Sequence, residues 1–368
     1  MPRKSVPVVF VLVGVLLLAA SVLLTATPEA PHDGFEVTWL GDTLLGDRAE
    51  ETLETYGYDW AFALLPRMDS SEVTVVNCEA PLTVRNELPD VDVFYEPGSP
   101  IPRYVVQTSR GEVTRYIHRS SPAAAASLAA IGVNVATLCN NHSLDQGPQG
   151  LQDTREALGS AGIAPIGAGL SADEALQPYV ADTPYGRLAV FAFGEEGGTA
   201  PDAAADSPGI CALNETNVSA ARVLARELDV QWMVAAVHWG NNYTGVLPVQ
   251  EQWARRLAES DFNLVVGTGP HVVQRIDIIG RTPVLYSLGN FVFQTGGRFT
   301  ESMPGYGLVA TTVLGPKGFR EIRLMPIQTD NDVVEYQPRP CDPAVARQVL
   351  EAVWPSIRVE DGIGVLQW

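Results

Sequence analysis

The stretch VNVATLCNNHSLDQGPQGLQDTREALGSAG, residues 133–162, contains the pattern that decides the fold. Its first ten residues are rich in apolar and β-branched side chains and predict a buried strand that ends at His142. From Pro148 to Ala161 the apolar residues return at helical spacing, and Gly162 then provides a stop signal. A buried strand followed by a helix is the repeating unit of α/β proteins, so this segment predicts an α/β fold.

The same alternation continues on both sides of this segment. Further strands are expected in the runs FEVTWLGD (35–42), VTVVNCE (73–79), GRLAVFAFG (186–194), QWMVAAVHWG (231–240) and NLVVGTGPHV (263–272). Helices are expected at 121–132, 218–228, 249–260 and 343–353, and loops with a short hairpin at 84–121. Residues 277–328 hold closely spaced strands separated by turn signals, which indicates antiparallel hairpins. We therefore expect a largely parallel first sheet that is joined by a strand-rich second half.

The N-terminus differs from the rest of the chain. Arg3 and Lys4 precede a stretch without charged side chains that lasts until Glu29, and its centre, Val8–Leu24, is 17 apolar or small residues. With its flanks it can cross the roughly 30 Å hydrocarbon core of a bilayer. We interpret it as an uncleaved transmembrane helix, and its positive flank then places the rest of the chain outside the cytoplasm. A cleaved signal peptide begins in the same way, and a buried core helix is a third interpretation.

These patterns divide the chain into four predicted parts. Residues 1–27 form a cytoplasmic stub with the membrane anchor, and residues 28–34 form a linker. Residues 35–330 form the main domain, and residues 331–368 form a C-terminal extension. The expected location is the cell membrane, with a single pass and an extracytoplasmic C-terminal domain.

Composition and charge exclude several classes of protein. Hydrophobic residues make up 46% of the 368 residues and charged residues 18%, as in an ordinary globular protein. The net charge of −19 argues against nucleic acid as a partner, because nucleic-acid binding needs a basic surface. The same charge would repel an anionic polymer unless a cation bridges the two. The four cysteines lack the C-x-x-C spacing of a structural zinc site and leave buried thiols or a disulfide open.

Polar side chains gather at the predicted strand ends. Asp42 and Glu79 end two strands, and His142, His238 and His271 end three more. Each has an ordinary explanation when taken alone, such as a turn residue, a surface carboxylate or a core histidine. Because ligands of open α/β sheets bind outside the carboxyl ends of the strands, the joint pattern indicates one shared site.

Carboxylates and imidazoles together suit a transition metal. Zn²⁺, Mn²⁺ and Fe accept this mixed ligand set, so we expect one or two divalent ions. Two ions about 3.5–4 Å apart would allow two-metal hydrolysis at phosphorus. Asn141 can supply an amide oxygen to a metal, and His142 can hold a proton near the attacking or leaving oxygen.

Seven motifs occur in order over roughly Phe35 to Ile327: GDTLLGD, NCEAPLT, CNNHSLDQGPQGLQDT, IGAGLSADEALQP, VHWGNNY, GTGPHVVQ and YSLGNFVF. This series resembles the CapA family of poly-γ-glutamate capsule synthesis proteins, within the calcineurin-like metallophosphoesterase superfamily. The third motif, which includes Asp145, Gly147, Gly150 and Thr154, is the most specific.

The resemblance implies a four-layer sandwich in which two mixed β-sheets are flanked by helices. Carried over by position, it implies a metal and phosphate site made of Asp42, Glu79, Asn141, His142, His238 and His271. Two positions depart from the pattern of the family and its superfamily. Leu44 stands where phosphoesterases of the superfamily have the histidine of Asp-x-His, and Gly269 stands where many relatives begin His-Pro-His.

Three functions follow as alternatives. The first is a membrane-anchored protein for the synthesis, export or anchoring of poly-γ-glutamate or a related capsule polymer. The second is an active metal-dependent phosphoesterase or other hydrolase at the cell surface. The third is a degenerate fold that only binds. The expected partners are an anionic polymer or phosphoester substrate, the membrane, and other membrane proteins of capsule synthesis.

Overall fold

The computed structural model describes residues 34–368 except 69, 87–92, 96–101, 109–110 and 295. The described residues belong to one compact unit, Gly34–Trp368. The predicted anchor, Val8–Leu24, and most of the linker lie outside them. No helix within the described ranges has the length and apolar character needed to span a bilayer.

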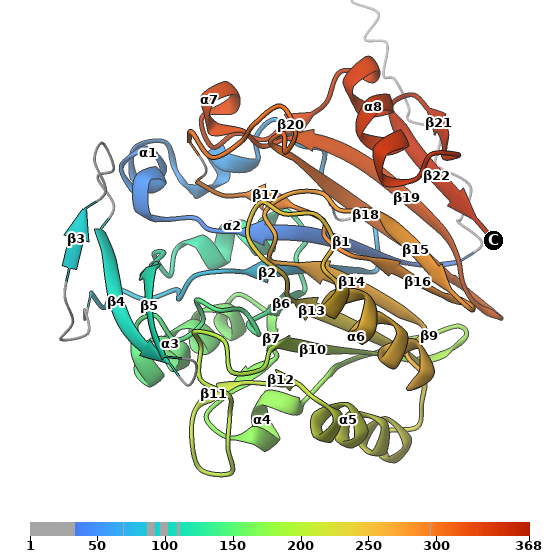
Figure 1. Cartoon of the computed structure of the whole chain (residues 1–368), viewed down its shortest axis with the longest axis horizontal. Coiled ribbons are helices and arrows are strands. Elements are labelled where there is room, and N and C mark those ends of the chain that lie inside the picture. Colours follow the sequence, from blue (N-terminus) through green and yellow to red (C-terminus); the bar gives the residue numbers. More distant parts are fainter. Residues whose placement is uncertain (1–33, 69, 87–92, 96–101, 109–110, 295) are drawn as a thin grey trace, which may run out of the picture. The chain divides into compact units, whose positions relative to one another are not determined.

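The first sheet combines parallel and antiparallel strands (Figure 1). Its parallel part consists of β1 (Phe35–Thr43), β2 (Val73–Cys78), β6 (Val135–Thr137), β7 (Ala164–Ile166) and the short β17 (Asn290–Val292), which pairs with β1. Its antiparallel part consists of β18 (Tyr306–Gly315), β19 (Gly318–Gln328), β20 (Arg339–Pro340), β21 (Arg358–Glu360) and β22 (Ile363–Gln367). Strand β18 pairs with β1 and so joins the two parts.

The second sheet is also mixed. Its order is β12 (Ala212–Leu213), β10 (Gly186–Glu195), β13 (Val230–His238), β14 (Leu264–Thr268), β16 (Thr282–Leu285) and β15 (Ile276–Ile279). Neighbours from β12 to β16 are parallel, whereas β15 and the additional strand β9 (Tyr179–Thr183) are antiparallel. The α/β class with mixed sheets is confirmed. The expectation that the parallel strands would gather in the first sheet is wrong, because an apolar run indicates burial on both faces but not which sheet the strand joins.

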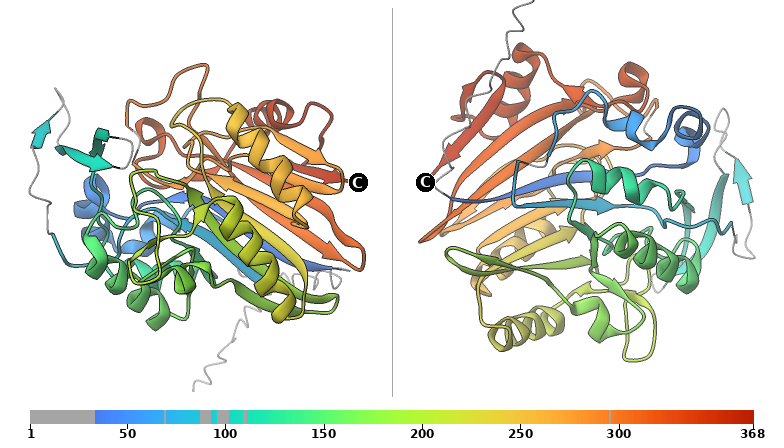
Figure 2. Two further views of the ribbon diagram at one scale, coloured as in Figure 1. Left: turned by 60° about the horizontal axis from the view of Figure 1, so that its bottom comes forward. Right: turned by 180° about the vertical axis from the view of Figure 1, so that it is seen from behind.

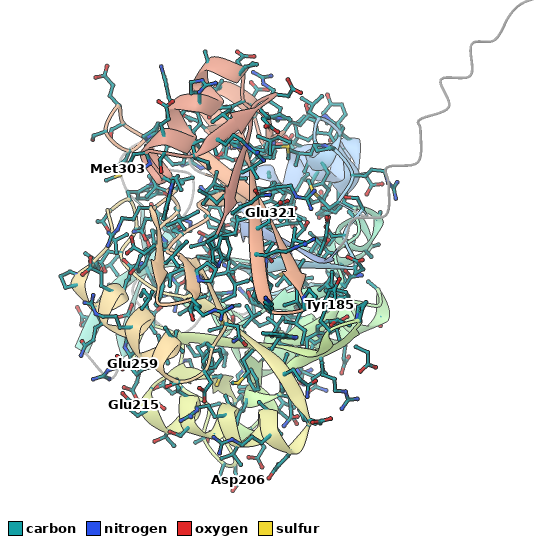
Figure 3. All side chains as sticks on the ribbon, turned by 90° about the vertical axis from the view of Figure 1, so that its right-hand side faces the viewer. Tyr185, Asp206, Glu215, Glu259, Met303 and Glu321 are labelled. Atoms are coloured by element: carbon teal, nitrogen blue, oxygen red, sulfur yellow. The ribbon has the colours of Figure 1, made fainter. Side chains whose placement is uncertain are left out.

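Alternating side chains on each strand produce the layers. In β1, Val37 and Trp39 enter a core between the sheets, whereas Leu40 faces the opposite side. In β10, Val190 enters the same central core and Phe191 faces outward. Figure 3 shows side chains filling the space between the ribbons.

Helices cover the outer faces of both sheets (Figure 2). Helices α2 (Ala124–Ala130) and α3 (Gly147–Ser160) pack on the first sheet, and α5 (Glu215–Glu227) and α6 (Pro248–Glu259) pack on the second. Helix α8 (Pro343–Val353), which has the predicted bounds, contacts β19. The other helical segments are η1 (Asp47–Ala49), α1 (Glu50–Tyr56), η2 (Tyr58–Phe62), α4 (Ala172–Leu176) and α7 (Asn331–Val334).

Two segments contain more strands than expected: the first has a third strand beside the predicted short hairpin, and the second has two strands in a predicted tail. The irregular stretch 84–121 contains a small antiparallel sheet of β3 (Val93–Tyr95), β4 (Pro102–Thr108) and β5 (Gly111–Tyr116). The residues after α8, expected as a tail, form β21 and β22, and β22 pairs with β19. The two-residue strands β8 (Ala168–Gly169) and β11 (Gly209–Ile210) form a separate pair.

Candidate metal centre

The site lies where strand ends of the two sheets meet. Asp42 is in β1, Glu79 directly follows β2, His238 ends β13 and His271 follows β14 by three residues. The pairing of β1 with β2 shifts register between Leu40 and Asp42, and such an irregularity re-aims the side chains that follow it. All four ionisable side chains are buried. Burying four ionisable side chains costs free energy. Such a cluster therefore indicates a functional site rather than ordinary core packing.

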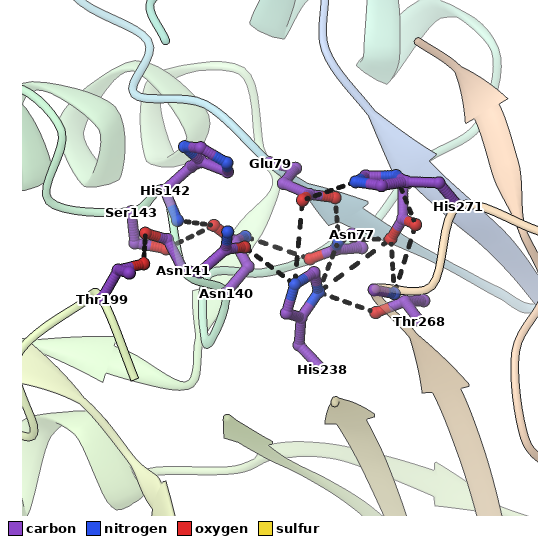
Figure 4. Close-up of polar contacts among 12 residues, drawn as sticks. Asn77, Glu79, Asn140, Asn141, His142, Ser143, Thr199, His238, Thr268 and His271 are labelled. Atoms are coloured by element: carbon purple, nitrogen blue, oxygen red, sulfur yellow. Dashed lines mark hydrogen bonds and ion pairs between the residues drawn. The ribbon is translucent and has the colours of Figure 1, made fainter. Parts of the chain in front are cut away.

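Asp42, Glu79 and His271 form the tightest cluster. One ligand atom from each lies within 4.8 Å of the others. The His271 ring stands between the two carboxylates, with Nδ1 3.2 Å from Asp42 Oδ2 and Nε2 3.6 Å from Glu79 Oε1. Figure 4 shows the ring directed toward Glu79. Three donors of this kind can hold a divalent cation.

His238 and Asn141 extend the cluster toward the second sheet. His238 Nε2 lies 3.7 Å from Glu79 Oε1 and 2.9 Å from Asn141 Oδ1. His238 Nδ1 lies 3.2 Å from Thr268 Oγ1 and 4.0 Å from Asp42 Oδ1. Three of the five predicted metal ligands therefore form one group, His238 lies within 4.0 Å of both carboxylates, and Asn141 contacts His238.

Asn77 is a site residue that the sequence analysis did not single out. Its Nδ2 donates to Asp42 Oδ1 at 2.8 Å and to Glu79 Oε2 at 3.1 Å. Asn140 Nδ2 donates to Asn77 Oδ1 at 3.1 Å and so fixes the orientation of the amide. The spacing Asn-x-Glu could have identified Asn77 from the sequence, because residues two apart at a strand end face the same side as each other.

The two carboxylates differ in how well they are satisfied. Both oxygens of Asp42 accept the backbone N–H of Gly269, at 3.1 and 3.2 Å, and one also accepts Asn77. Glu79 Oε2 accepts Asn77, but Glu79 Oε1 is buried and has no hydrogen-bond donor among the described residues. A buried carboxylate oxygen without a donor costs about 1–3 kcal/mol or more, so a native structure normally gives it a partner.

The pKa values of the two carboxylates shift in opposite directions. Burial and the neighbouring Asp42 raise the pKa of Glu79 well above its ordinary value. Burial also acts to raise the pKa of Asp42, but His271, His238 and Asn77 outweigh it and the net shift is downward. Burial lowers the pKa of His238 to about 4, against the attraction of Asp42. The site therefore favours a neutral His238, and the ionised form of Glu79 is costly in the metal-free protein.

His142 lies beside the cluster rather than in it. Strand β6 ends at Thr137, earlier than predicted, because the polar side chains that follow take over backbone hydrogen bonding: Asn140 Nδ2 donates to Cys78 O at 2.8 Å. His142 thus sits in a loop, and Figure 4 shows its ring turned away from His238. Together with His271 it lines a cavity of about 90 Å³.

Asp145 fixes the imidazole of His142. Its Oδ2 lies 2.7 Å from His142 Nδ1, and its Oδ1 accepts the guanidinium of Arg115. Arg115 and His142 outweigh the effect of burial and lower the pKa of Asp145, so the carboxylate is ionised and His142 Nδ1 carries the hydrogen. Burial lowers the pKa of His142 to about 3, and its Nε2 is then an acceptor. His118, which the sequence analysis left in the insertion, has its ring centre 4.2 Å from that of His142, with the two rings tilted by 52°.

Neutral His142 gives the metal-free protein a defined pH dependence. The folded imidazole has a pKa near 3, whereas the unfolded value is 6.5, so the unfolded chain binds the extra proton. Stability that His142 allows at pH 7 is therefore lost as the pH falls below 6.5, by about 2 kcal/mol at pH 5. We expect His142→Gln to reduce the loss of unfolding free energy between pH 7 and pH 5 by that amount. Urea denaturation at both pH values measures it, and an unchanged difference would contradict a neutral buried imidazole.

Two positions that depart from the family pattern are explained by packing. Leu44 is buried in a small apolar cluster with Ala80 and Phe293. Gly269 has φ +111°, a conformation that side chains other than glycine rarely adopt. All four cysteines are free, and Cys78, Cys139 and Cys211 are buried.

Comparison with known proteins gives the family. The chain is 25% identical over 304 residues to the capsule biosynthesis protein CapA of Bacillus anthracis, a match that covers 80% of this chain and 69% of that one. It is 25% identical to the PGA biosynthesis protein CapA of Bacillus subtilis, with 79% and 72% coverage. A phosphatase structure from Mycoplasma pneumoniae aligns at 10% identity and a TM-score of 0.45, over 82% of this chain and 96% of that one.

The family model for the bacterial capsule synthesis protein PGA_cap matches residues 36–295, which contain every residue of the cluster described above. The resemblance to CapA proteins in the sequence motifs is thereby confirmed. This chain belongs to the bacterial capsule synthesis protein family PGA_cap.

Proposed function

We propose that this protein acts in bacterial capsule synthesis, on poly-γ-glutamate or a related anionic polymer, through a divalent cation bound at Asp42, Glu79 and His271. Membership of the PGA_cap family and the names of the two Bacillus relatives support the capsule role. The apolar segment Val8–Leu24 would hold the protein at the membrane and leave the site outside the cytoplasm.

The metal proposal rests on one observation, the buried oxygen Oε1 of Glu79 that has no hydrogen-bond donor among the described residues. This oxygen is buried and without a donor, 3.6 Å from His271 Nε2 and 3.7 Å from His238 Nε2. Two carboxylates and two imidazoles converge there, and a cation would satisfy the oxygen and offset the unbalanced charge. The oxygen and nitrogen donors fit Mn²⁺, Zn²⁺ or Fe and leave the choice among them open.

The site residues divide the work. Asp42, Glu79 and His271 would hold the cation, with His238 and Asn141 beside it. A bound divalent cation polarises a phosphoryl or carbonyl oxygen and lowers the pKa of water. His142, kept neutral and oriented by Asp145, lines the cavity that it shares with His271, and its Nε2 would accept or return a proton.

A non-catalytic role is the second candidate, and one observation favours it. The apolar packing of Leu44 and the absent side chain of Gly269 leave the cluster two imidazoles short of the full superfamily pattern. A single cation held this way would bridge the acidic protein to an anionic polymer without cleaving it.

The first experiment is metal loading of the full chain. We expect calorimetric titration with Mn²⁺ and Zn²⁺ to show about one cation per chain, and His238→Ala to weaken binding at least tenfold. The loaded protein is then offered a chromogenic phosphoester and a γ-linked glutamate oligomer. Asp182→Asn, on an exposed side chain, is the control. Binding with hydrolysis supports the enzyme, binding without hydrolysis supports the bridging role, and no stoichiometric binding removes the metal proposal.

A further inference from the structure

The cavity beside His142 and His271 has an unusual charge pattern for this protein. Arg48 and Arg298 line it, together with three histidines, whereas no aspartate or glutamate among the described residues does. The chain as a whole has 43 acidic and 24 basic residues. A pocket lined by two guanidinium groups and free of acidic side chains is therefore not what the average surface of this protein would produce.

The two arginines occupy the rim and the imidazoles the floor. Arg48 and Arg298 are exposed, whereas His118, His142 and His271 are buried. A group that enters from solvent meets the guanidinium groups first and the candidate metal centre behind them. Guanidinium offers paired donors that match the oxygens of a carboxylate or phosphate.

Three separate segments hold this rim together. Arg298, from the loop after β17, donates to Tyr116 Oη and lies over the ring of Tyr116, 5.3 Å from its centre. Tyr116 ends β5 and stacks on His118. At Arg48, which lies in η1, the backbone N–H donates to Gln294 Oε1 at 2.9 Å. These hydrogen bonds and ring contacts restrict the motion of the rim residues. Residues that are already positioned lose less conformational entropy when they bind a ligand.

Two carboxylates near this rim already have partners. Asp332 lies beside Gly296 and accepts the backbone N–H of Gly297 at 3.0 Å. Asp47, next to Arg48, is paired with His118 Nδ1, and its Oδ2 also accepts Gln294 Nε2 at 2.8 Å. This arrangement turns its negative charge toward the buried imidazole.

A second cavity, which His238 lines, differs from the first in the charge of its lining residues. It has a volume of about 220 Å³ and is lined by Asn141, Glu195 and His238 among others, and no arginine or lysine of the described ranges lines it. Asn242 lines both cavities, so they flank the same centre. An anionic group is favoured on the Arg48 and Arg298 side and disfavoured on the Glu195 side.

From this geometry we propose that Arg48 and Arg298 form an oxyanion-binding subsite, which holds a carboxylate or phosphate group of the substrate next to the candidate metal centre. The proposal rests on the proposed function for the identity of the substrate. The binding chemistry itself needs only the two arginines. A substrate with anionic groups on both sides of the reacting bond would place one of them here.

The test uses the metal-free full chain, so that it does not depend on metal binding or hydrolysis. Calorimetry measures the dissociation constants of γ-linked triglutamate and of inorganic phosphate at low salt. We expect Arg298→Gln and Arg48→Gln each to weaken binding about tenfold. Arg298→Lys keeps the charge but loses the paired donors, and should recover only part of the affinity. Arg281→Gln, an exposed arginine that donates to Lys317 O, is the matched control.

The outcomes separate the sources of the oxyanion. A loss for triglutamate supports the subsite with a carboxylate as its ligand, and a loss for phosphate alone supports it with a phosphoester as the source. Unchanged dissociation constants for both probes in Arg298→Gln and Arg48→Gln would overturn the proposal. Equal loss in Arg281→Gln would do the same, because it would show general attraction to positive surface charge. A chain that binds triglutamate here but no metal would refute the metal site and leave the subsite standing.

Discussion

Glu79→Gln is expected to stabilise the metal-free protein and at the same time to abolish tight cation binding. The carboxylate of Glu79 is fully buried, and one of its oxygens has no donor. Glutamine has the same shape, removes the buried charge and can donate to a neutral imidazole nearby. Its oxygen can still accept Asn77 Nδ2 in the place of Glu79 Oε2. We expect a gain of about 1–3 kcal/mol in unfolding free energy.

The gain should depend on pH in a defined direction. Because the folded pKa of Glu79 is raised, the folded metal-free chain binds more protons than the unfolded chain above pH 4.5. The wild-type protein therefore loses stability as the pH rises from 4.5 toward that raised pKa, and Glu79→Gln does not. The advantage of the variant should grow over this range and then level off.

Denaturation with chelator, and again with Mn²⁺, measures both effects. The metal should stabilise the wild-type protein and leave the variant nearly unchanged, since loss of this ligand is expected to lower affinity by about 100-fold or more. Glu36→Gln is the matched control, because Glu36 is buried but paired with Arg323, and its neutralisation should destabilise the chain. If Glu79→Gln destabilised the metal-free protein as Glu36→Gln does, Glu79 would be an ordinary buried carboxylate.

Strand ends were the part of the site that sequence could predict. Asp42, Glu79, His238 and His271 each follow an apolar run, and parallel strands bring their carboxyl ends to one edge. The pattern did not show that the edge belongs to two sheets. Strands β1 and β2 lie in one sheet and β13 and β14 in the other, so the site forms where the sheets meet.

The residues that sequence missed depend on geometry finer than strand order. Asn77 acts through the direction of one amide, and Gly269 acts through a backbone N–H that carries no side-chain signal. His118 lies in the insertion 84–121, which has no strong periodicity, and reaches the cavity only because β5 ends beside it. Long-range placement of an irregular segment is set by tertiary contacts that local patterns do not encode.

The carboxylates of Asp42 and Glu79 have different roles in cation binding. Asp42 is held by the Gly269 N–H and by Asn77, so its oxygens are fixed before any ligand arrives. Glu79 keeps one oxygen unpaired and a raised pKa. Asp42 thus supplies orientation and permanent charge, whereas Glu79 supplies a buried oxygen that has no donor until a cation binds. Instability at Glu79 in the empty site becomes binding free energy when a cation arrives.

Gly269 is the position where the backbone, rather than a side chain, sets the site. Its φ is +111°, and a Cβ added there would lie 2.7 Å from the carbonyl oxygen of Trp239 and 3.2 Å from His238 Nε2. The contact with Trp239 is to backbone, which cannot move aside cheaply. A histidine at this position would meet the same obstacle, so this chain cannot accept an imidazole there by a single substitution.

We therefore expect Gly269→Ala to destabilise the protein by roughly 2–4 kcal/mol, because the strain of a positive φ adds to the steric overlap. The shift should also displace the N–H that Asp42 accepts and weaken Mn²⁺ binding at least tenfold. Gly280→Ala is the matched control, since Gly280 has φ +65° and no atom within 4 Å of its added Cβ, and should cost only about 1 kcal/mol. Urea denaturation and metal titration of both variants measure the difference. Equal destabilisation would show that the close approach to Trp239 has no energetic weight, whereas a loss of Mn²⁺ affinity confined to Gly269→Ala would tie the backbone of this loop directly to the cation site.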